Sequence, residues 1–163
     1  MNRPGVIDLD DLAAACAAHR DAGRAVVLCH GCFDLLHVGH ARYLAAAREH
    51  GDVLAVTVTP DALVNKGPDR PVVPGPQRAE LLAALRVVDH VALNRWPTAE
   101  PTLGLLRPAV YAKGAEYAAA LDTPGSAVER ERRACETHGG RFVLIGGEKF
   151  SSTALLRRSR RAG

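Results

Sequence analysis

The stretch AVVLCHGCFDLLHVGHARYLAAAR, residues 25–48, decides the fold of this chain. It opens on the short apolar run AVVLC, which suits a buried parallel strand, and it closes on HARYLAAAR, which reads as a helix. The ten residues from Gly31 to His40 carry two glycines, Gly31 and Gly39, and two histidines, His37 and His40. A strand that passes through a glycine-containing turn into a helix is the repeating unit of parallel α/β sheets.

The rest of the chain repeats this alternation. A proline-rich segment, KGPDRPVVPGP at residues 66–76, interrupts it and is expected to be a loop. The pattern predicts an α/β fold, a single Rossmann-like domain over residues 1–163 with a doubly wound, parallel, five-stranded sheet and helices on both faces. The expected strands are 25–29, 53–59, 89–94, 110–113 and 141–147, and the expected helices are 8–23, 40–51, 77–88, 98–107, 126–140 and 151–161.

Composition places the chain among ordinary folded proteins. Its 163 residues fit one domain, and 47% hydrophobic with 24% charged residues argues against extensive disorder. The sequence has no 18-residue apolar run, and its amino terminus lacks the basic and apolar regions of a signal peptide. We therefore expect a cytoplasmic protein with no membrane partner and with its four cysteines reduced.

The net charge of +3 comes from one end of the chain. Four arginines lie in the tail at residues 157–163, so the remainder carries 17 basic against 18 acidic residues. The body of the protein is therefore not basic, and no nucleic-acid partner is expected. We interpret the basic C-terminal tail as a solubilising helix end, with phosphate contacts as the alternative.

Four polar segments follow four of the predicted strands. They are residues 31–40, 66–70, 113–114 and 151–153. Parallel α/β sheets bind ligands outside the carboxyl ends of their strands, where the strand order reverses. These segments are therefore expected to meet at one site.

The first of these segments suits phosphate. A helix that begins near Gly39 presents unpaired N–H groups and the positive end of its dipole. His37 and His40 are three residues apart, so both imidazoles can face the same anion from the first turn. Either ring can donate a hydrogen bond to a phosphate oxygen. The competing interpretation is that these histidines are only helix caps or surface residues.

A metal site is the second interpretation of the same stretch. Cys29 and Cys32 form a CxxC, and Cys135 with His138 supplies the other two ligand types of a structural zinc site. Geometry argues against it, because Cys29 belongs to a buried strand and Cys135 to a helix expected elsewhere on the sheet. We expect no metal ligands among the side chains.

Two motifs resemble those of a known family. GCFDLLHVGH, residues 31–40, resembles the GxFDxxHxGH signature of the cytidylyltransferase-like nucleotidyltransferases. KGPDRPVVPGPQR, residues 66–78, is similar to the KGxxRPVxPxxxR loop of the heptose-1-phosphate adenylyltransferase (ADP-heptose synthase) domain. The resemblance runs from about Val6 to Leu156, and four segments in the family's order are far more specific than one HxGH.

The resemblance implies a reaction and a set of roles. A sugar-phosphate oxygen attacks the α-phosphorus of a nucleoside triphosphate, ATP in preference to CTP, and pyrophosphate leaves with Mg²⁺ as the expected cofactor. The implied catalytic residues are His37, His40 and Lys66, and Arg70 and Arg78 would bind the substrate. Asp34 would orient a histidine. The implied nucleotide- and phosphate-binding residues are Gly31, Cys32, Phe33, Asp34, Gly39, Lys113, Gly114, Ser151, Ser152 and Thr153.

Alternatives stay open at this stage. Arg78 lies on a predicted helix and could only pair with an acid, and Lys113 with Gly114 could be a turn beside a charge. Trp96 and Tyr117 are expected to pack rather than to stack on a base. CTP with a polyol phosphate or a phosphonate is the alternative chemistry, although GGEKFSST lacks the arginine of the RTxGIST that glycerol-phosphate cytidylyltransferases carry. A non-catalytic nucleotide-binding domain is the other alternative, and a homodimer is compatible with each.

Overall fold

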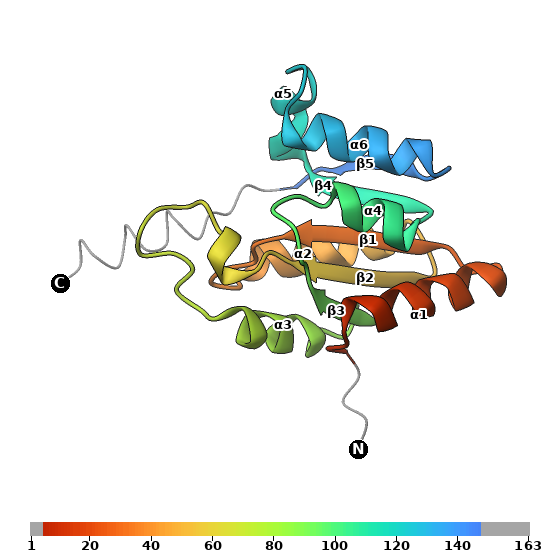
Figure 1. Ribbon diagram of the computed structural model, residues 1–163. Coiled ribbons are helices and arrows are strands. Elements are labelled where there is room, and N and C mark those ends of the chain that lie inside the picture. Colours follow the sequence, from red (N-terminus) through yellow and green to blue (C-terminus); the bar gives the residue numbers. More distant parts are fainter. Residues whose placement is uncertain (1–4, 148–163) are drawn as a thin grey trace.

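The computed structural model describes residues 5–147 and contains a five-stranded parallel sheet. The strand order is β3-β2-β1-β4-β5, so the chain runs outward in one direction from β1 and then returns to its other side (Figure 1). This is the predicted doubly wound α/β fold. The strands are β1 Val26–Gly31, β2 Val53–Val58, β3 His90–Leu93, β4 Val110–Gly114 and β5 Arg141–Ile145.

The helices cover both faces of the sheet (Figure 1). Two of them, α2 and α3, contribute side chains to one apolar cluster, whereas α1, α4 and α6 contribute to the cluster on the opposite face. Their bounds are α1 Leu9–Asp21, α2 Val38–Arg48, α3 Gly75–Ala83, α4 Glu100–Leu106, α5 Ala118–Leu121 and α6 Ala127–Thr137, with short 3-10 turns η1 Asp61–Leu63 and η2 Ala115–Tyr117.

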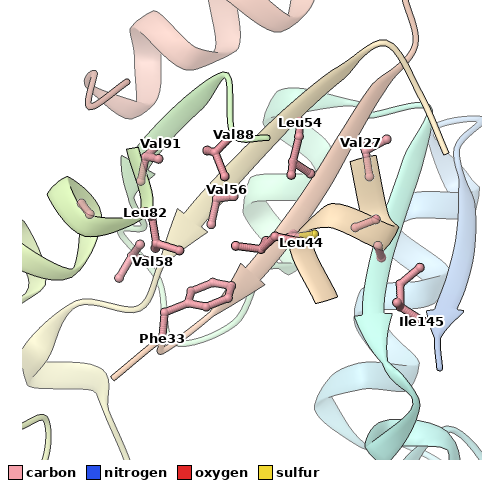
Figure 2. Packing of buried hydrophobic residues seen from close by; sticks show 14 of the residues in the cluster. Val27, Phe33, Leu44, Leu54, Val56, Val58, Leu82, Val88, Val91 and Ile145 are labelled. Carbon is pink, nitrogen blue, oxygen red and sulfur yellow. The ribbon is translucent and has the colours of Figure 1, made fainter. Parts of the chain in front are cut away.

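Successive side chains along a strand belong in turn to the two apolar clusters. In β1, Val27 and Cys29 belong to the cluster under α2 and α3, and Val26 and Leu28 to the other. Successive side chains of a strand point to opposite faces, so a fully apolar strand fills both cores at once. Figure 2 shows Leu44 of α2 among the side chains of the first cluster, to which Leu82 of α3 also belongs.

The reversal of strand order lies between β1 and β4. Both neighbours of β1 pair with it in parallel, with Gly31 opposite Val58 and Cys29 opposite Ala112. The loops after β1, β2 and β4 therefore leave the same edge of the sheet, and the segment after β2 extends well beyond the strands there (Figure 1). This edge is where the sequence placed the ligand site.

Many element boundaries differ from the predicted ones by a few residues. β1 continues through Gly31, because pairing with β2 holds His30 and Gly31 in the ladder. α3 begins at Gly75, and the 3-10 turns with α5 were not expected. The expected helix at residues 151–161, the SST segment and the basic tail lie outside the described residues. In the described part of the chain, no helix has both the length and the apolar character needed to cross a bilayer.

Candidate active site at the carboxyl ends of β1, β2 and β4

The turn after β1 is built around Phe33. Phe33 and Leu35 have φ angles of 51° and 55°, in the left-handed region that side-chain-bearing residues rarely adopt. Burial of the Phe33 ring in the core beside α2 and α3 offsets this strain (Figure 2). A Cβ on Gly31 would lie 3.2 Å from that ring, a tight contact that the ring would have to relieve by shifting a few tenths of an ångström. Phe33 therefore packs in the core, and its expected contact with nucleotide stays a prediction.

His37 and His40 begin helix α2 as a reciprocal cap. Nδ1 of His37 accepts from the backbone N–H of Gly39 at 3.1 Å, and Nδ1 of His40 accepts from the backbone N–H of His37 at 3.4 Å. The two rings stack with centroids 3.9 Å apart. Both histidines are therefore helix caps, and this role is compatible with a catalytic one.

Capping fixes where each histidine carries its proton. Burial, followed by the charge of Lys66, lowers the pKa of His37. Burial, then the neighbouring His37 and Lys66, lowers the pKa of His40 to about 4. Both rings are therefore neutral near pH 7. Since each Nδ1 is an acceptor, the single proton of each neutral ring is on Nε2. The cap thus sets two Nε2–H donors on the first turn of α2.

Lys66 supplies positive charge to the same place. It lies in the exposed loop between η1 and Arg70, and its charge reaches both histidines strongly enough to lower their pKa values. A helix start and two neutral N–H donors therefore lie at the switch point, with the charge of Lys66 near enough to affect both rings. Such a set of donors suits an anion with several oxygens.

Asp34, expected to orient a histidine, is held by contacts with the proline-rich loop. Its buried carboxylate accepts the backbone N–H groups of Val72 and Val73 at 3.0 Å and pairs with Nε of Arg70 at 2.5 Å. Burial would raise the pKa of Asp34, but these N–H donors and the Arg70 guanidinium together lower it. Asp34 and Arg70 bind each other and fix the proline-rich loop, and their expected contacts with nucleotide and substrate stay predictions.

Arg78, expected to bind the substrate, is held by several contacts within the protein. Its side chain is fully buried, and its guanidinium donates to the carbonyl oxygens of Val73 and Thr59, each at 2.9 Å, and to that of Cys32. It also pairs with Asp61 at 2.6 Å. Sequence reasoning missed Asp61, although an acid three residues after the end of a strand at the ligand edge was an available signal.

The Lys113 side chain is also held by contacts within the protein. Its buried ammonium lies 3.3 Å from Glu131 of α6 and 3.3 Å from the carbonyl oxygen of His30. Glu131 in turn accepts from the Tyr111 hydroxyl at 2.7 Å and from the backbone N–H of Ala99 at 2.9 Å. Sequence reasoning expected Lys113 to bind nucleotide, and it missed Glu131, whose only signal was an acid on the buried face of an amphipathic helix.

The remaining candidates have clear places. Gly114 ends β4, where a Cβ would collide with the Glu116 carboxylate, and Cys32 joins the site through its carbonyl oxygen. Tyr117 lies over the Lys113 ammonium, 4.8 Å from it to the ring centroid, and is partly exposed. Trp96 packs against the cluster that holds α1 and α4, as expected. The roles of Ser151, Ser152 and Thr153 stay predictions, because those residues lie outside the described range.

The four residues of the alternative zinc site are not together. Cys29 belongs to the core beneath α2 and α3, whereas Cys135 of α6 belongs to the core on the other face. Burial raises the pKa of the Cys29 thiol to about 12 and that of Cys135 to about 11. Among residues 5–147, no group of three or more histidine, cysteine or acidic side chains is placed to hold a metal ion.

The buried His30 makes the stability of the fold depend on pH. It is buried at the end of β1, with Nδ1 3.0 Å from the Thr57 hydroxyl. Burial, then the charge of Lys113, lowers its pKa from 6.5 to about 4. Between these two pH values the unfolded chain binds more protons than the folded one. The contribution of His30 to the free energy of unfolding is therefore fully present above pH 6.5 and is lost as the pH falls toward 4.

We expect the free energy of unfolding to fall by roughly 3 kcal/mol for His30 alone between pH 7 and pH 4, since one pKa unit corresponds to about 1.36 kcal/mol. Urea denaturation at a series of pH values measures this. His30→Asn keeps a hydrogen-bond partner for Thr57 but cannot titrate. An equally steep pH dependence in that variant would show that His30 is not the source.

The sequence of the chain matches a family model described as cytidylyltransferase-like over residues 28–158, which covers the sheet edge and all the segments above. The chain belongs to the cytidylyltransferase-like family. This confirms the resemblance seen in the motifs. The matched residues include the histidine pair, the Lys66 loop and the switch point of the sheet, so these features belong to a cytidylyltransferase-like domain.

Curated relatives are much longer proteins. The chain is 45% identical over 155 residues to the bifunctional protein HldE of Streptomyces coelicolor, covering 93% of this chain and 32% of that protein. It is 42% identical over 153 residues to the bifunctional protein HldE of Geobacter sulfurreducens, covering 93% of this chain and 30% of that protein. The chain thus spans about a third of the length of these relatives.

Solved structures share the fold. A lipopolysaccharide core biosynthesis protein from Thermoplasma volcanium matches with a TM-score of 0.61 and 25% identity, over 79% of this chain and all of that one. A pantothenate synthetase from Thermus thermophilus matches with a TM-score of 0.65 at 16% identity, over 96% of this chain and 70% of that one. The second likeness supports the fold alone.

Proposed function

We propose that this chain is a nucleotidyltransferase that moves a nucleoside monophosphate from a triphosphate, ATP by preference, to a sugar phosphate such as a heptose 1-phosphate. The observation that carries the proposal is the reciprocal histidine cap, which sets the Nε2–H groups of His37 and His40 beside the charge of Lys66. The identity to HldE proteins supports the sugar-phosphate class of acceptor.

The reaction needs no protein nucleophile. A phosphate oxygen of the acceptor attacks the α-phosphorus, a new P–O bond forms, and the bond between the α-phosphorus and the bridging oxygen breaks to release pyrophosphate. Negative charge on the oxygens around the α- and β-phosphorus is then stabilised by donors already in place, the general basis of such catalysis. Lys66 offsets the repulsion between the acceptor phosphate and the triphosphate.

We infer that Mg²⁺ binds together with the triphosphate substrate. The described residues offer no cluster of three protein ligands, and Asp34 is held by Arg70 and the loop. The cation would therefore be ligated by triphosphate oxygens and water, where it neutralises the leaving pyrophosphate. Activity should be lost in EDTA and return when excess Mg²⁺ is added.

A pyrophosphate-release screen tests the proposal. ATP, CTP, GTP and UTP are each combined with heptose 1-phosphates, glycerol 3-phosphate and simple phosphonates. We expect ATP with a heptose 1-phosphate to give the highest kcat/KM. A tenfold preference for CTP, about 1.4 kcal/mol of differential transition-state binding, would assign the chain to the alternative chemistry. Nucleotide binding without release from any pair would identify a binding domain.

A further inference from the structure

The segment that carries Lys66 is tied to the protein at both of its ends. At its start, Asp61 accepts from Arg78 at 2.6 Å and from the backbone N–H of Gly75 at 2.8 Å. At its end, the N–H groups of Val72 and Val73 donate to Asp34. Between these two anchors the chain forms the exposed loop that extends beyond the strands (Figure 1).

Both anchors are buried charges that join distant segments. The Asp34 side chain is 0% exposed and its partner Arg70 is 7% exposed, while the Arg78 side chain is 0% exposed. Arg78 reaches Cys32 after β1, Thr59 after β2 and Val73 in the loop itself. Only a guanidinium has enough donors, in a fixed plane, to serve acceptors on three segments at once.

Burying an ionised side chain is expensive unless its hydrogen bonds are satisfied, so such groups define one geometry sharply. Asp34 belongs to the turn that leads into His37, and Arg78 binds the carbonyl oxygen of Cys32 in that same turn. The histidine turn and the Lys66 loop therefore share both anchors. Any displacement of one must break charged hydrogen bonds to the other.

We propose that Asp34 and Arg78 are positioning residues that hold the two ends of segment 61–73 against the histidine turn and thereby set the place of Lys66 relative to His37 and His40. The catalytic consequence rests on the proposed function, but the positioning itself does not. Neither residue touches the reacting atoms in this role. Both act through Lys66.

Histidine titration followed by NMR tests the positioning without any substrate. Lys66→Ala should raise the pKa values of His37 and His40, because it removes a nearby positive charge. Arg78→Lys lacks the guanidinium fork that joins three segments, so it should also raise the pKa values of His37 and His40. In a protein that already carries Lys66→Ala, Arg78→Lys should leave these two pKa values unchanged. Unchanged histidine titrations in a folded Arg78→Lys protein would overturn the proposal.

Arg48→Lys is the matched control, since Arg48 also binds a carbonyl oxygen and an acid, those of Gly51 and Asp89, but away from the histidines. It should leave the histidine titrations as they are. If Arg78→Lys fails to fold, Asp61→Asn provides the milder variant, because the Asp61 side chain is 47% exposed. The backbone amide of Gly75, which donates to Asp61, should then exchange at least tenfold faster than in wild type, and unchanged exchange would contradict the anchoring.

The kinetic arm uses the same double-mutant cycle. Arg78→Lys should lower kcat at least tenfold when Lys66 is present and less than about twofold when Lys66 is alanine. Equal factors in both backgrounds would show that Arg78 contributes stability alone. If no substrate pair gives turnover, the proposed function fails, and the histidine titrations still decide the positioning.

Discussion

His37→Asn should lower kcat on the order of 10²- to 10³-fold and leave the fold intact. Asparagine is among the best N-cap residues, and its side-chain oxygen can take the place of Nδ1 as acceptor for the Gly39 N–H. It has no donor where Nε2–H stood. Loss of one preorganised donor to developing charge is worth about 3 to 4 kcal/mol. Steady-state kinetics with the best substrate pair, beside a thermal melt, measures both effects.

The matched control for capping is Ser126→Ala. Ser126 caps α6 by accepting from the Glu129 N–H, at a helix outside the histidine turn. Its loss should lower stability by about 1 kcal/mol and leave kcat unchanged. If His37→Asn kept more than about a third of wild-type kcat, well under 1 kcal/mol by the rate relation, the histidine pair would be a cap and nothing more.

Glu131→Ala should destabilise the protein by about 3 to 5 kcal/mol, the range expected when one partner of a buried ion pair is removed. The Lys113 ammonium would be left buried without its counter-charge, and the Tyr111 hydroxyl would lose its acceptor. Burial would raise the pKa of Glu131, but Lys113 and the N–H of Ala99 lower it, so the group removed is an anion. Urea denaturation at pH 7 gives the change directly.

Glu100→Ala is the comparison for that variant. Glu100 pairs with Arg130 at 3.0 Å, but both side chains are well exposed, so the loss should stay below about 1 kcal/mol. Replacing both buried partners, Lys113→Met with Glu131→Leu, should recover much of the lost stability because no unpaired charge remains. Similar losses for Glu131→Ala and Glu100→Ala would refute the claim that burial decides the strength of the pair.

Local pattern was sufficient for the fold and for the histidine pair. Apolar runs between helical segments predicted the parallel sheet, because strands buried on both faces must be apolar throughout. The three-residue spacing of His37 and His40 put both rings on one helical turn. These properties depend on residues close in the chain, where backbone geometry fixes the outcome.

The sequence by itself therefore determined the α/β class, the edge of the sheet where the predicted site lies, and the turn that carries the histidine pair. Only the tertiary structure decided which charges remain available to a ligand. The sequence does not distinguish the charge of Lys66 from those of Arg70, Arg78 and Lys113. In the structure each of these three is paired with an acid, and Arg78 lies 46 residues from its Cys32 acceptor. A charge buried by folding must find its partners in whatever segments the topology brings alongside, and no local pattern encodes that neighbour.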